Sequence, residues 1–262
     1  MENSDIIKEE NNNGKIMDSK KRLIIIIGCS VLLMAVSIFF LIKKDEIATS
    51  VFKCGDKIAY QGETYKTIQI EEQCWMRENL KATKYRNETP ITNFETNSRW
   101  SNDTIGAYSC YQNLEENCDT YGALYNWYAI SNPVGLCPEG WSIPSNDQWT
   151  DLERSVCEKL GNNNCQTEFA YDSLAGWRGT DEGRNLKSKT YNGSDAFGFS
   201  ALLGGFRNAS GPFSYLEEKG FWWASNASEE FADSRMLDAE NQKVRQLESM
   251  KSSGFSVRCI KD

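Results

Sequence analysis

The hydrophobic and polar positions of the chain are distributed unevenly, because one segment holds most of the continuous apolar sequence. Residues 23–42 form a run of 20 without a charged side chain, flanked by Lys20–Arg22 and by Lys43–Lys44. A run of this length matches the hydrocarbon thickness of a bilayer. It predicts one transmembrane helix that binds the lipid bilayer through residues 23–42, and the basic excess before it places the N-terminus in the cytoplasm.

Two other interpretations of this segment remain open. A cleaved signal peptide has a shorter apolar core with small residues after it, and Ala48–Ser50 provides such residues. A lipoprotein would carry its modification on Cys29, which only a short apolar stretch precedes. The length of the run favours the transmembrane helix, in which Cys29 is a small apolar residue.

The segment divides the chain into parts of different character. Residues 1–22 are polar and predict a disordered cytoplasmic tail. Residues 43–53 are expected to form a linker, and residues 54–262 are long enough for one domain with a sizeable core. This organisation predicts a single-pass membrane protein with an extracellular C-terminal domain.

Within the domain, the helical pattern is clearest at residues 146–160. Its apolar face consists of Trp149, Leu152, Val156 and Leu160. Ser145 and Gln148 can form a capping box at its start, and Gly161 follows its end. A second, shorter helix is predicted at residues 121–128, where Tyr121, Leu124, Tyr125 and Tyr128 share a face.

Short apolar and β-branched segments separated by turn residues predict strands in the rest of the domain. The candidate strands are residues 64–70, 197–203, 221–224, 234–237, 243–247 and 255–259. Two early helices followed by a strand-rich remainder predict an α+β fold.

Eight of the nine cysteines lie in residues 54–262, which is typical of a domain exported to an oxidising compartment. Eight cysteines allow 105 pairings. Three pairs bracket short segments and the remaining two cysteines form the fourth, which gives Cys54–Cys74, Cys110–Cys118, Cys157–Cys165 and Cys137–Cys259 as a hypothesis. A zinc site is disfavoured, because the chain has neither closely paired cysteines nor any histidine.

The distribution of charge excludes some partners. The chain has a net charge of −8, and seven basic and five acidic residues up to Lys44 contribute +2, which leaves −10 for residues 45–262. This sign opposes binding to nucleic acid and to anionic membrane surfaces. Because the chain has no histidine, it has no histidine general base and no Ser-His-Asp triad.

Four segments of the domain resemble a known family. They are QCWMRENL at residues 73–80, YGALYNWYA at 121–129, LCPEGWSIPS at 136–145 and GFSVRC at 254–259. Their content and order resemble the Fibrobacter succinogenes major paralogous domain over about residues 54–262. The resemblance implies a bacterial protein directed to the cell surface, in a family whose members mostly have no known function.

Two shorter segments are similar to a second family. The sequences IPSNDQW at residues 143–149 and GFSVR at 254–258 resemble parts of the formylglycine-generating-enzyme family. That family has a C-type-lectin-like fold, in which the end of the chain pairs with its beginning in one sheet. The resemblance therefore implies a C-type-lectin-like, disulfide-stapled domain. It does not extend to the oxidase activity, because the copper-binding cysteine pair of that enzyme is not recognisable here.

Two kinds of side chain are candidates for a binding site. Loops rich in oxygen ligands make calcium possible as a cofactor, with Asp103, Asp181 and Glu182 as candidate ligands. Aromatic rings that stack on sugars or anchor protein contacts are expected among Trp177, Tyr215, Trp222 and Trp223. Since Trp222 and Trp223 are adjacent, a strand would turn them to opposite faces, and we expect at least one in the core.

These features predict a surface-exposed binding or adhesion module for an unknown extracellular glycan or protein, with no evident catalysis. One alternative is an extracellular hydrolase that acts on glycans through paired carboxylates. Its candidate carboxylates are Glu115–Glu116, Asp181–Glu182, and Glu229–Glu230 with Asp233. The other alternative is a structural component of the cell surface.

Overall fold

The computed structural model describes Met34, residues 52–172 and residues 176–262. The chain divides into two units, Met1–Phe52 and Lys53–Asp262. The predicted transmembrane segment, apart from Met34, lies outside the described residues, as do the predicted tail and most of the predicted linker. Among the described residues, none of the helices has the length and apolar character that crossing a bilayer requires.

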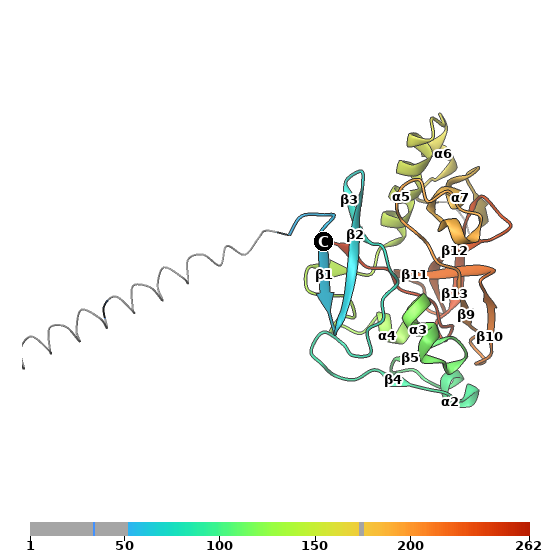
Figure 1. The fold of residues 1–262 in the computed structure, drawn as a ribbon. Helices are drawn as coiled ribbons and strands as arrows, with labels where there is room; N and C mark the ends of the chain where they lie inside the picture. Colours follow the sequence, from blue (N-terminus) through green and yellow to red (C-terminus); the bar gives the residue numbers. More distant parts are fainter. Residues whose placement is uncertain (1–33, 35–51, 173–175) are drawn as a thin grey trace, which may run out of the picture. The chain divides into compact units, whose positions relative to one another are not determined.

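The unit from Lys53 to Asp262 has the expected α+β class, with three sheets and short helices in its described part (Figure 1). The first sheet is antiparallel and has the order β1-β2-β3-β14-β7. Its strands are β1 (Lys57–Tyr60), β2 (Glu63–Ile70), β3 (Gln73–Met76), β7 (Trp141–Ser142) and β14 (Ile260–Lys261). Because β14 pairs with both β3 and β7, the end of the unit lies in the same sheet as its beginning.

The second sheet has six strands in the order β10-β9-β11-β12-β13-β8. They are β8 (Gly176–Arg178), β9 (Gly204–Arg207), β10 (Phe213–Leu216), β11 (Lys219–Ala227), β12 (Phe231–Asp238) and β13 (Val244–Met250). The strands predicted at 221–224, 234–237 and 243–247 lie within or largely within β11, β12 and β13. The strand predicted at 197–203 is wrong, because Gly198 and Ser200 have positive φ angles that turn the chain there.

A third sheet contains β4 (Thr92–Asn93), β5 (Ala107–Ser109) and β6 (Leu124–Tyr125). The helix predicted over residues 121–128 is therefore wrong, because β6 lies between α3 (Glu115–Tyr121) and α4 (Trp127–Ile130). The cause is Gly122, which follows α3 with φ +81°. A Cβ atom there would lie 2.6 Å from Asn79 Cβ, so the chain turns where only glycine fits.

Helix α5 (Asn146–Lys159) confirms the predicted helix and its start. Ser145 Oγ accepts a hydrogen bond from Gln148 N–H at 3.1 Å, and Gln148 Oε1 accepts one from Ser145 N–H at 2.8 Å. The two bonds satisfy donors that a helix start leaves free. Shorter helices are α2 (Asn97–Ser101), α6 (Cys165–Glu168), α7 (Glu182–Leu186) and the 3₁₀ turns Tyr111–Asn113 and Lys189–Tyr191.

Helices α5 and α7 pack on one face of the six-stranded sheet (Figure 1). The shared core contains Trp149, Leu152 and Val156 of α5, Leu186 of α7, and Trp222, Ala224, Leu237 and Val244 of the sheet. Trp75 and Ile260 of the first sheet belong to the same cluster. One core therefore joins the two larger sheets through α5.

The segment predicted as a strand over residues 255–259 forms isolated bridges instead of a continuous strand. Residues 253–260 are all buried, because all three sheets surround them. Main-chain bonds of 2.8–3.2 Å reach each sheet, from Phe255 to Tyr125, from Ser256 to Phe221 and Trp223, from Val257 to Leu80 and from Cys259 to Met76. The side chains of this segment therefore do not alternate between the core and the solvent, as those of a half-buried strand would.

Three buried cations lie against neutral oxygens instead of carboxylates. Arg207 donates to the carbonyls of Phe94, Glu95 and Gly211, Lys187 to those of Asp238 and Asn241, and Arg258 to Phe199 O and Asn79 Oδ1. Burial lowers the pKa of Arg258 to about 9 and that of Arg207 to about 10. These cations hold loops to the sheets through hydrogen bonds in which the charged group is the donor.

The described residues contain four disulfides, which are the predicted pairs: Cys54–Cys74, Cys110–Cys118, Cys137–Cys259 and Cys157–Cys165. The Cys137–Cys259 bond spans 122 residues and joins the segment before α5 to the end of the chain. The Cys110–Cys118 and Cys157–Cys165 bonds each span only 8 residues.

The different loop lengths give a testable prediction. Replacing both Cys137 and Cys259 by alanine should lower the free energy of unfolding by about 5 kcal/mol, because the unfolded chain regains the entropy of a long loop. The matched change at Cys110 and Cys118 should cost about 2.6 kcal/mol by the same relation. Guanidinium unfolding of the oxidised proteins measures both values. A larger loss for the short loop would contradict the expectation.

Candidate functional site

A cleft of about 530 Å³ lies where separate segments of the chain meet, and we take it as the candidate binding site. Its walls come from the loop after β3, from α4 and the loop that follows it, from β7, from the first turn of α5 and from β11. Clefts of this volume are typical of sites for small ligands or for a few residues of a polymer.

The inner part of the cleft is apolar. Trp127, Ile130, Leu136, Trp141 and Ile143 line it. Trp127 and Trp141 are only 7% and 4% exposed, so neither indole presents a whole ring face to solvent. Trp127 packs edge-on against Trp223 in the core, with ring centroids 5.9 Å apart. The two rings therefore supply an apolar floor and not a stacking platform.

Local structure fixes the position of Trp127 on this floor. Asn126 caps α4, because its Oδ1 accepts a hydrogen bond from Ala129 N–H at 3.1 Å. The same oxygen accepts one from Ala107 N–H on β5 at 2.9 Å, and Asn126 Nδ2 donates to Asp103 at 2.8 Å. This buried asparagine ties the short helix to the neighbouring sheet.

The rim of the cleft is polar and carries Arg86, Ser131, Ser142, Gln148 and Ser225. Arg86 Nε donates to the carbonyl of Cys137 at 3.1 Å, and its Nη2 donates to the carbonyl of Trp141 at 3.4 Å. Its guanidinium lies against Gly135, where a Cβ atom would be 3.0 Å from Nη2. The position of Arg86 is thus set by neutral groups and by the absence of a side chain at Gly135.

The cleft differs in charge from the domain around it. None of its lining residues is acidic, whereas residues 45–262 carry a net charge of −10. Within the described part of the chain, Arg86 forms no ion pair with a carboxylate. The rim therefore presents a fixed positive charge on an otherwise acidic domain.

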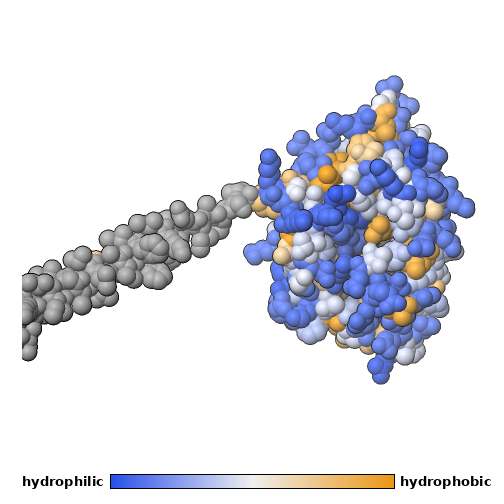
Figure 2. All heavy atoms as spheres, viewed as in Figure 1, coloured by the Kyte–Doolittle hydropathy of each residue, from blue (hydrophilic) through white to orange (hydrophobic). Residues whose placement is uncertain are grey.

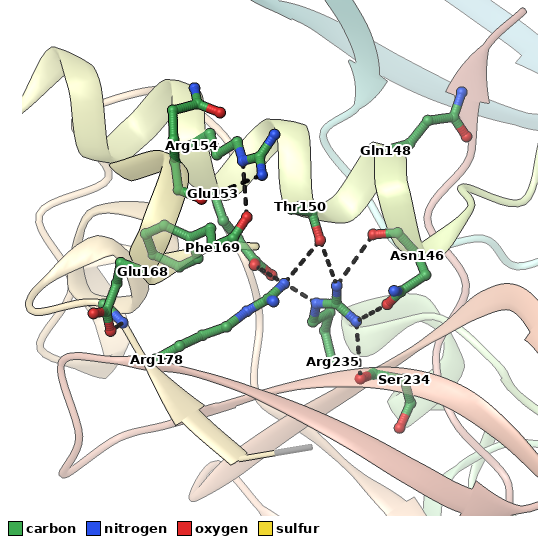
Figure 3. Close-up of polar contacts among 12 residues, drawn as sticks. Asn146, Gln148, Thr150, Glu153, Arg154, Glu168, Phe169, Arg178, Ser234 and Arg235 are labelled. Atoms are coloured by element: carbon green, nitrogen blue, oxygen red, sulfur yellow. Dashed lines mark hydrogen bonds and ion pairs between the residues drawn. The ribbon is translucent and has the colours of Figure 1, made fainter. Parts of the chain in front are cut away.

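A buried ionic network lies beside α5, between that helix and the six-stranded sheet (Figure 3). Glu153 pairs with Arg178 of β8 and, at 2.6 Å, with Arg235 of β12. Arg235 also donates to Asn146 Oδ1 at 2.8 Å, and Arg178 donates to Thr150 Oγ1 at 3.0 Å. All five side chains are buried, so the network fixes α5 on the sheet and is closed to a substrate.

The calcium candidates do not converge in the structure. Asp103 accepts hydrogen bonds from Gly106 N–H and Asn126 Nδ2, whereas Asp181 and Glu182 lie at the start of α7. Glu182 Oε2 accepts a bond from Thr180 N–H at 2.6 Å. Among the described residues, no group of three or more acidic, cysteine or histidine side chains has the geometry of a metal site.

The aromatic candidates are also dispersed. Trp177 and Tyr215 are 38% and 44% exposed, but they lie on β8 and β10, the two edge strands of the six-stranded sheet. Arg245 covers the ring of Trp177, and Lys219 lies 4.7 Å from the ring centre of Tyr215. Trp222 and Trp223 are 1% and 0% exposed, because both faces of β11 are covered, and they are core residues.

One residue of the acidic clusters lies opposite a carboxylate on a neighbouring strand. Asp233 on β12 lies directly opposite Glu248 on β13. Burial raises the pKa of the Asp233 carboxyl, and the nearby Glu248 raises it further while Arg235 opposes the rise. Glu115, Glu116, Glu229 and Glu230 are exposed. Neither Asp233 nor Glu248 lines the cleft described above.

The sequence pattern missed Arg86 as a functional candidate, because nothing local marks it. The available signal was indirect, since Trp127, Cys137, Trp141 and Ile143 all lie within the motifs that carry the family resemblance. The meeting of several such motifs at one cleft indicates a binding site more strongly than the exposure of aromatic rings on separate strands does.

One comparison with known proteins identifies a family. The sequence profile of the Fibrobacter succinogenes major domain matches residues 68–261, a range that contains every residue lining the cleft. Neither a curated protein nor a solved structure matches the chain.

The buried carboxylates give a second prediction. Replacing Glu153 by glutamine should lower the free energy of unfolding by about 3 kcal/mol, because Arg178 and Arg235 then remain buried without a counter-charge. Replacing Glu182 by glutamine at neutral pH should not destabilise the protein, because burial raises the pKa of Glu182 and no cation compensates its charge. Urea unfolding at pH 7 measures both effects.

The difference in stability between the wild type and Glu182→Gln has a predicted pH dependence. Between the pKa of Glu182 in the unfolded chain and its higher pKa in the folded protein, the folded state keeps a proton that the unfolded chain has lost. Stability from this group therefore rises as the pH falls through that range. If Glu182→Gln has a higher free energy of unfolding than the wild type at pH 7, this difference should shrink as the pH falls. A difference that grows on acidification would contradict a raised pKa of Glu182 in the folded protein.

Proposed function

The chain belongs to the Fibrobacter succinogenes major domain family, and from this premise we propose that it is a bacterial surface protein whose exported domain binds an extracellular ligand. Residues 23–42 anchor it in the membrane as a single helix, with the N-terminus in the cytoplasm. The domain from Lys53 to Asp262 then stands outside the cell. The four disulfides among its described residues support an extracellular location, because such bonds persist in oxidising compartments.

The observation that carries the proposal is the cleft between α4, β7 and α5. It combines an apolar floor with a polar rim and a cation that lacks an ionic partner among the described residues. Convergent polar groups around an apolar pocket are typical of binding sites. Elsewhere, the face seen in Figure 2 is mostly hydrophilic, and its hydrophobic residues form small, separate spots. That face offers no broad apolar patch as a competing site.

A C-type-lectin-like arrangement is the finer fold that we propose for the domain. The pairing of β14 with β3 supports it, because the end and the beginning of the domain share a sheet. The Cys137–Cys259 bond strengthens that closure.

A substitution at the cleft tests the proposed function. An array of extracellular glycans and peptides, probed with the full chain and its disulfides intact, identifies the ligand. Ser225→Trp should then reduce its affinity at least tenfold, because Ser225 is exposed on the cleft rim and a large side chain there fills the space. Ser98→Trp, at an exposed position lining a different cleft, is the matched control and should bind normally.

Two results would reject the proposal. One is the absence of any ligand on the array, which would favour a structural surface component. The other is equal binding by wild type and Ser225→Trp, which would place the ligand elsewhere. Thermal unfolding of both tryptophan variants, with midpoints close to that of the wild type, ensures that a loss of binding is local.

A hydrolase is the second candidate function, and the Asp233–Glu248 pair is the observation that favours it. A carboxyl whose pKa is raised beside a second carboxylate is the arrangement that acid–base catalysis uses. Asp233→Asn should abolish any hydrolysis of a surface glycan by the full chain. If instead hydrolysis is found and survives Asp233→Asn and Glu248→Gln, this pair is not the catalytic one.

A further inference from the structure

We infer that the cleft binds the C-terminal end of a peptide, with the terminal carboxylate at Arg86 and an aliphatic terminal side chain on the apolar floor. This inference rests on the proposed function and specifies the ligand of the same site. It follows from four properties of the cleft: its fixed cation, its apolar floor, the polar groups on its rim and its charge relative to the domain.

The guanidinium of Arg86 is placed and still has donors to spare. Of its five N–H groups, one on Nε and one on Nη2 reach the carbonyls of Cys137 and Trp141. Three N–H groups remain, including both on Nη1. A planar fork that is already oriented by the protein favours a carboxylate, because little side-chain entropy is lost on binding.

No residue of the protein neutralises this cation in the described structure. Glu88, two residues further along, pairs with Lys84 at 2.8 Å. The carbonyls that hold Arg86 are neutral, and the cleft contains no acidic side chain. An incoming carboxylate therefore meets an available positive charge and no negative charge among the lining residues.

The floor of the cleft selects an aliphatic group over a sugar ring. Stacking on a sugar needs an exposed aromatic face. Trp127 and Trp141 are almost wholly buried, so they add only parts of their rings to a surface shared with Ile130, Leu136 and Ile143. Such a surface gains free energy from burying branched aliphatic carbons.

Polar groups on the rim suit the main chain of a peptide. Ser142 and Ser225 line the cleft with hydroxyl groups that both donate and accept. The indole N–H of Trp127 has no hydrogen-bond partner among the described residues, although the residue lines the cleft. A peptide bond next to the terminal residue offers the carbonyl oxygen that this donor lacks.

The charge of the whole domain argues against a long acidic polymer. A net charge of −10 over residues 45–262 repels polyanions such as uronic acid polysaccharides. A single carboxylate next to an apolar group meets the positive rim without bringing further charges to the acidic surface. The cleft is thus matched to one negative charge at the end of a chain.

Nuclear magnetic resonance of the full chain, with ¹⁵N-labelled tryptophan and intact disulfides, tests the inference. The probe is the peptide acetyl-Gly-Ala-Leu with a free carboxylate, and its C-terminal amide is the control ligand. The acid should shift the indole N–H signal of Trp127, which a Trp127→Phe variant assigns. We expect the amide to bind at least tenfold more weakly, because it lacks the charge that Arg86 recognises.

Two substitutions at Arg86 separate charge from geometry. Arg86→Gln should reduce affinity for the acid at least tenfold and bring it to the level of the amide. Arg86→Lys should retain part of the difference, because it keeps the charge but loses the planar fork. Arg184→Gln removes an exposed arginine that lines a different cleft, and should bind like the wild type.

Several results would overturn the inference. Equal binding of acid and amide, or of wild type and Arg86→Gln, would remove the carboxylate from the site. Shifts at Trp127 caused by methyl glucuronide and not by the peptide would make the ligand an acidic sugar. If a neutral ligand from the array binds in the cleft and is displaced by Ser225→Trp, the proposed function stands and this inference alone fails.

Discussion

The main-chain bonding of residues 253–260 to all three sheets is the constraint on which the rest of the domain depends. This segment is buried along its whole length and lies between elements that are distant in sequence. Its carbonyls and amides bond to Tyr125 in the third sheet, to β11 in the second, and to Met76 of β3 in the first. Arg258 and Cys259 add a charged hydrogen-bond donor and a disulfide to the same short stretch.

Buried charge is handled in two different ways in this domain. Glu153 neutralises Arg178 and Arg235 in a closed network, so removing it leaves two cations exposed to a medium of low polarity. Arg207, Arg258 and Lys187 instead donate to neutral oxygens, and burial lowers the pKa of all three side chains. Arg86 uses the second arrangement at the surface. The same kind of bond that holds loops inside the domain thus prepares a cation on its outside.

The sequence predicted those parts of the fold whose signals are local. The capping box at Ser145 and Gln148 and the apolar face after it define α5 without reference to any other element. The two short cysteine pairs follow from spacing, and β2, β11, β12 and β13 follow from β-branched and aromatic runs. The helix prediction for residues 121–128 failed, although the spacing of their apolar side chains fits a helix. The chain turns at Gly122, where Asn79 of another segment leaves no room for a side chain.

The candidate site could not be predicted from local sequence patterns, because it too depends on contacts between distant segments. Arg86, Trp141 and Ser225 meet only after the sheets are assembled, and an exposed tryptophan in a strand looks like a better ligand contact than an arginine in a loop. The rings of Trp177 and Tyr215, which were candidates for ligand contact, are exposed, but the order of strands separates them. Exposure and site formation are therefore distinct properties of a residue.

The disulfide between Cys137 and Cys259 has a consequence for when the cleft can exist. Cys137 is part of the cleft wall, and its partner Cys259 lies 122 residues later in the sequence. Strand β14, which pairs with the β7 wall of the cleft, follows directly after Cys259. A nascent chain that has not yet reached these residues therefore lacks both the bond and the strand, so the complete cleft forms only after Cys259 has been synthesised and oxidised.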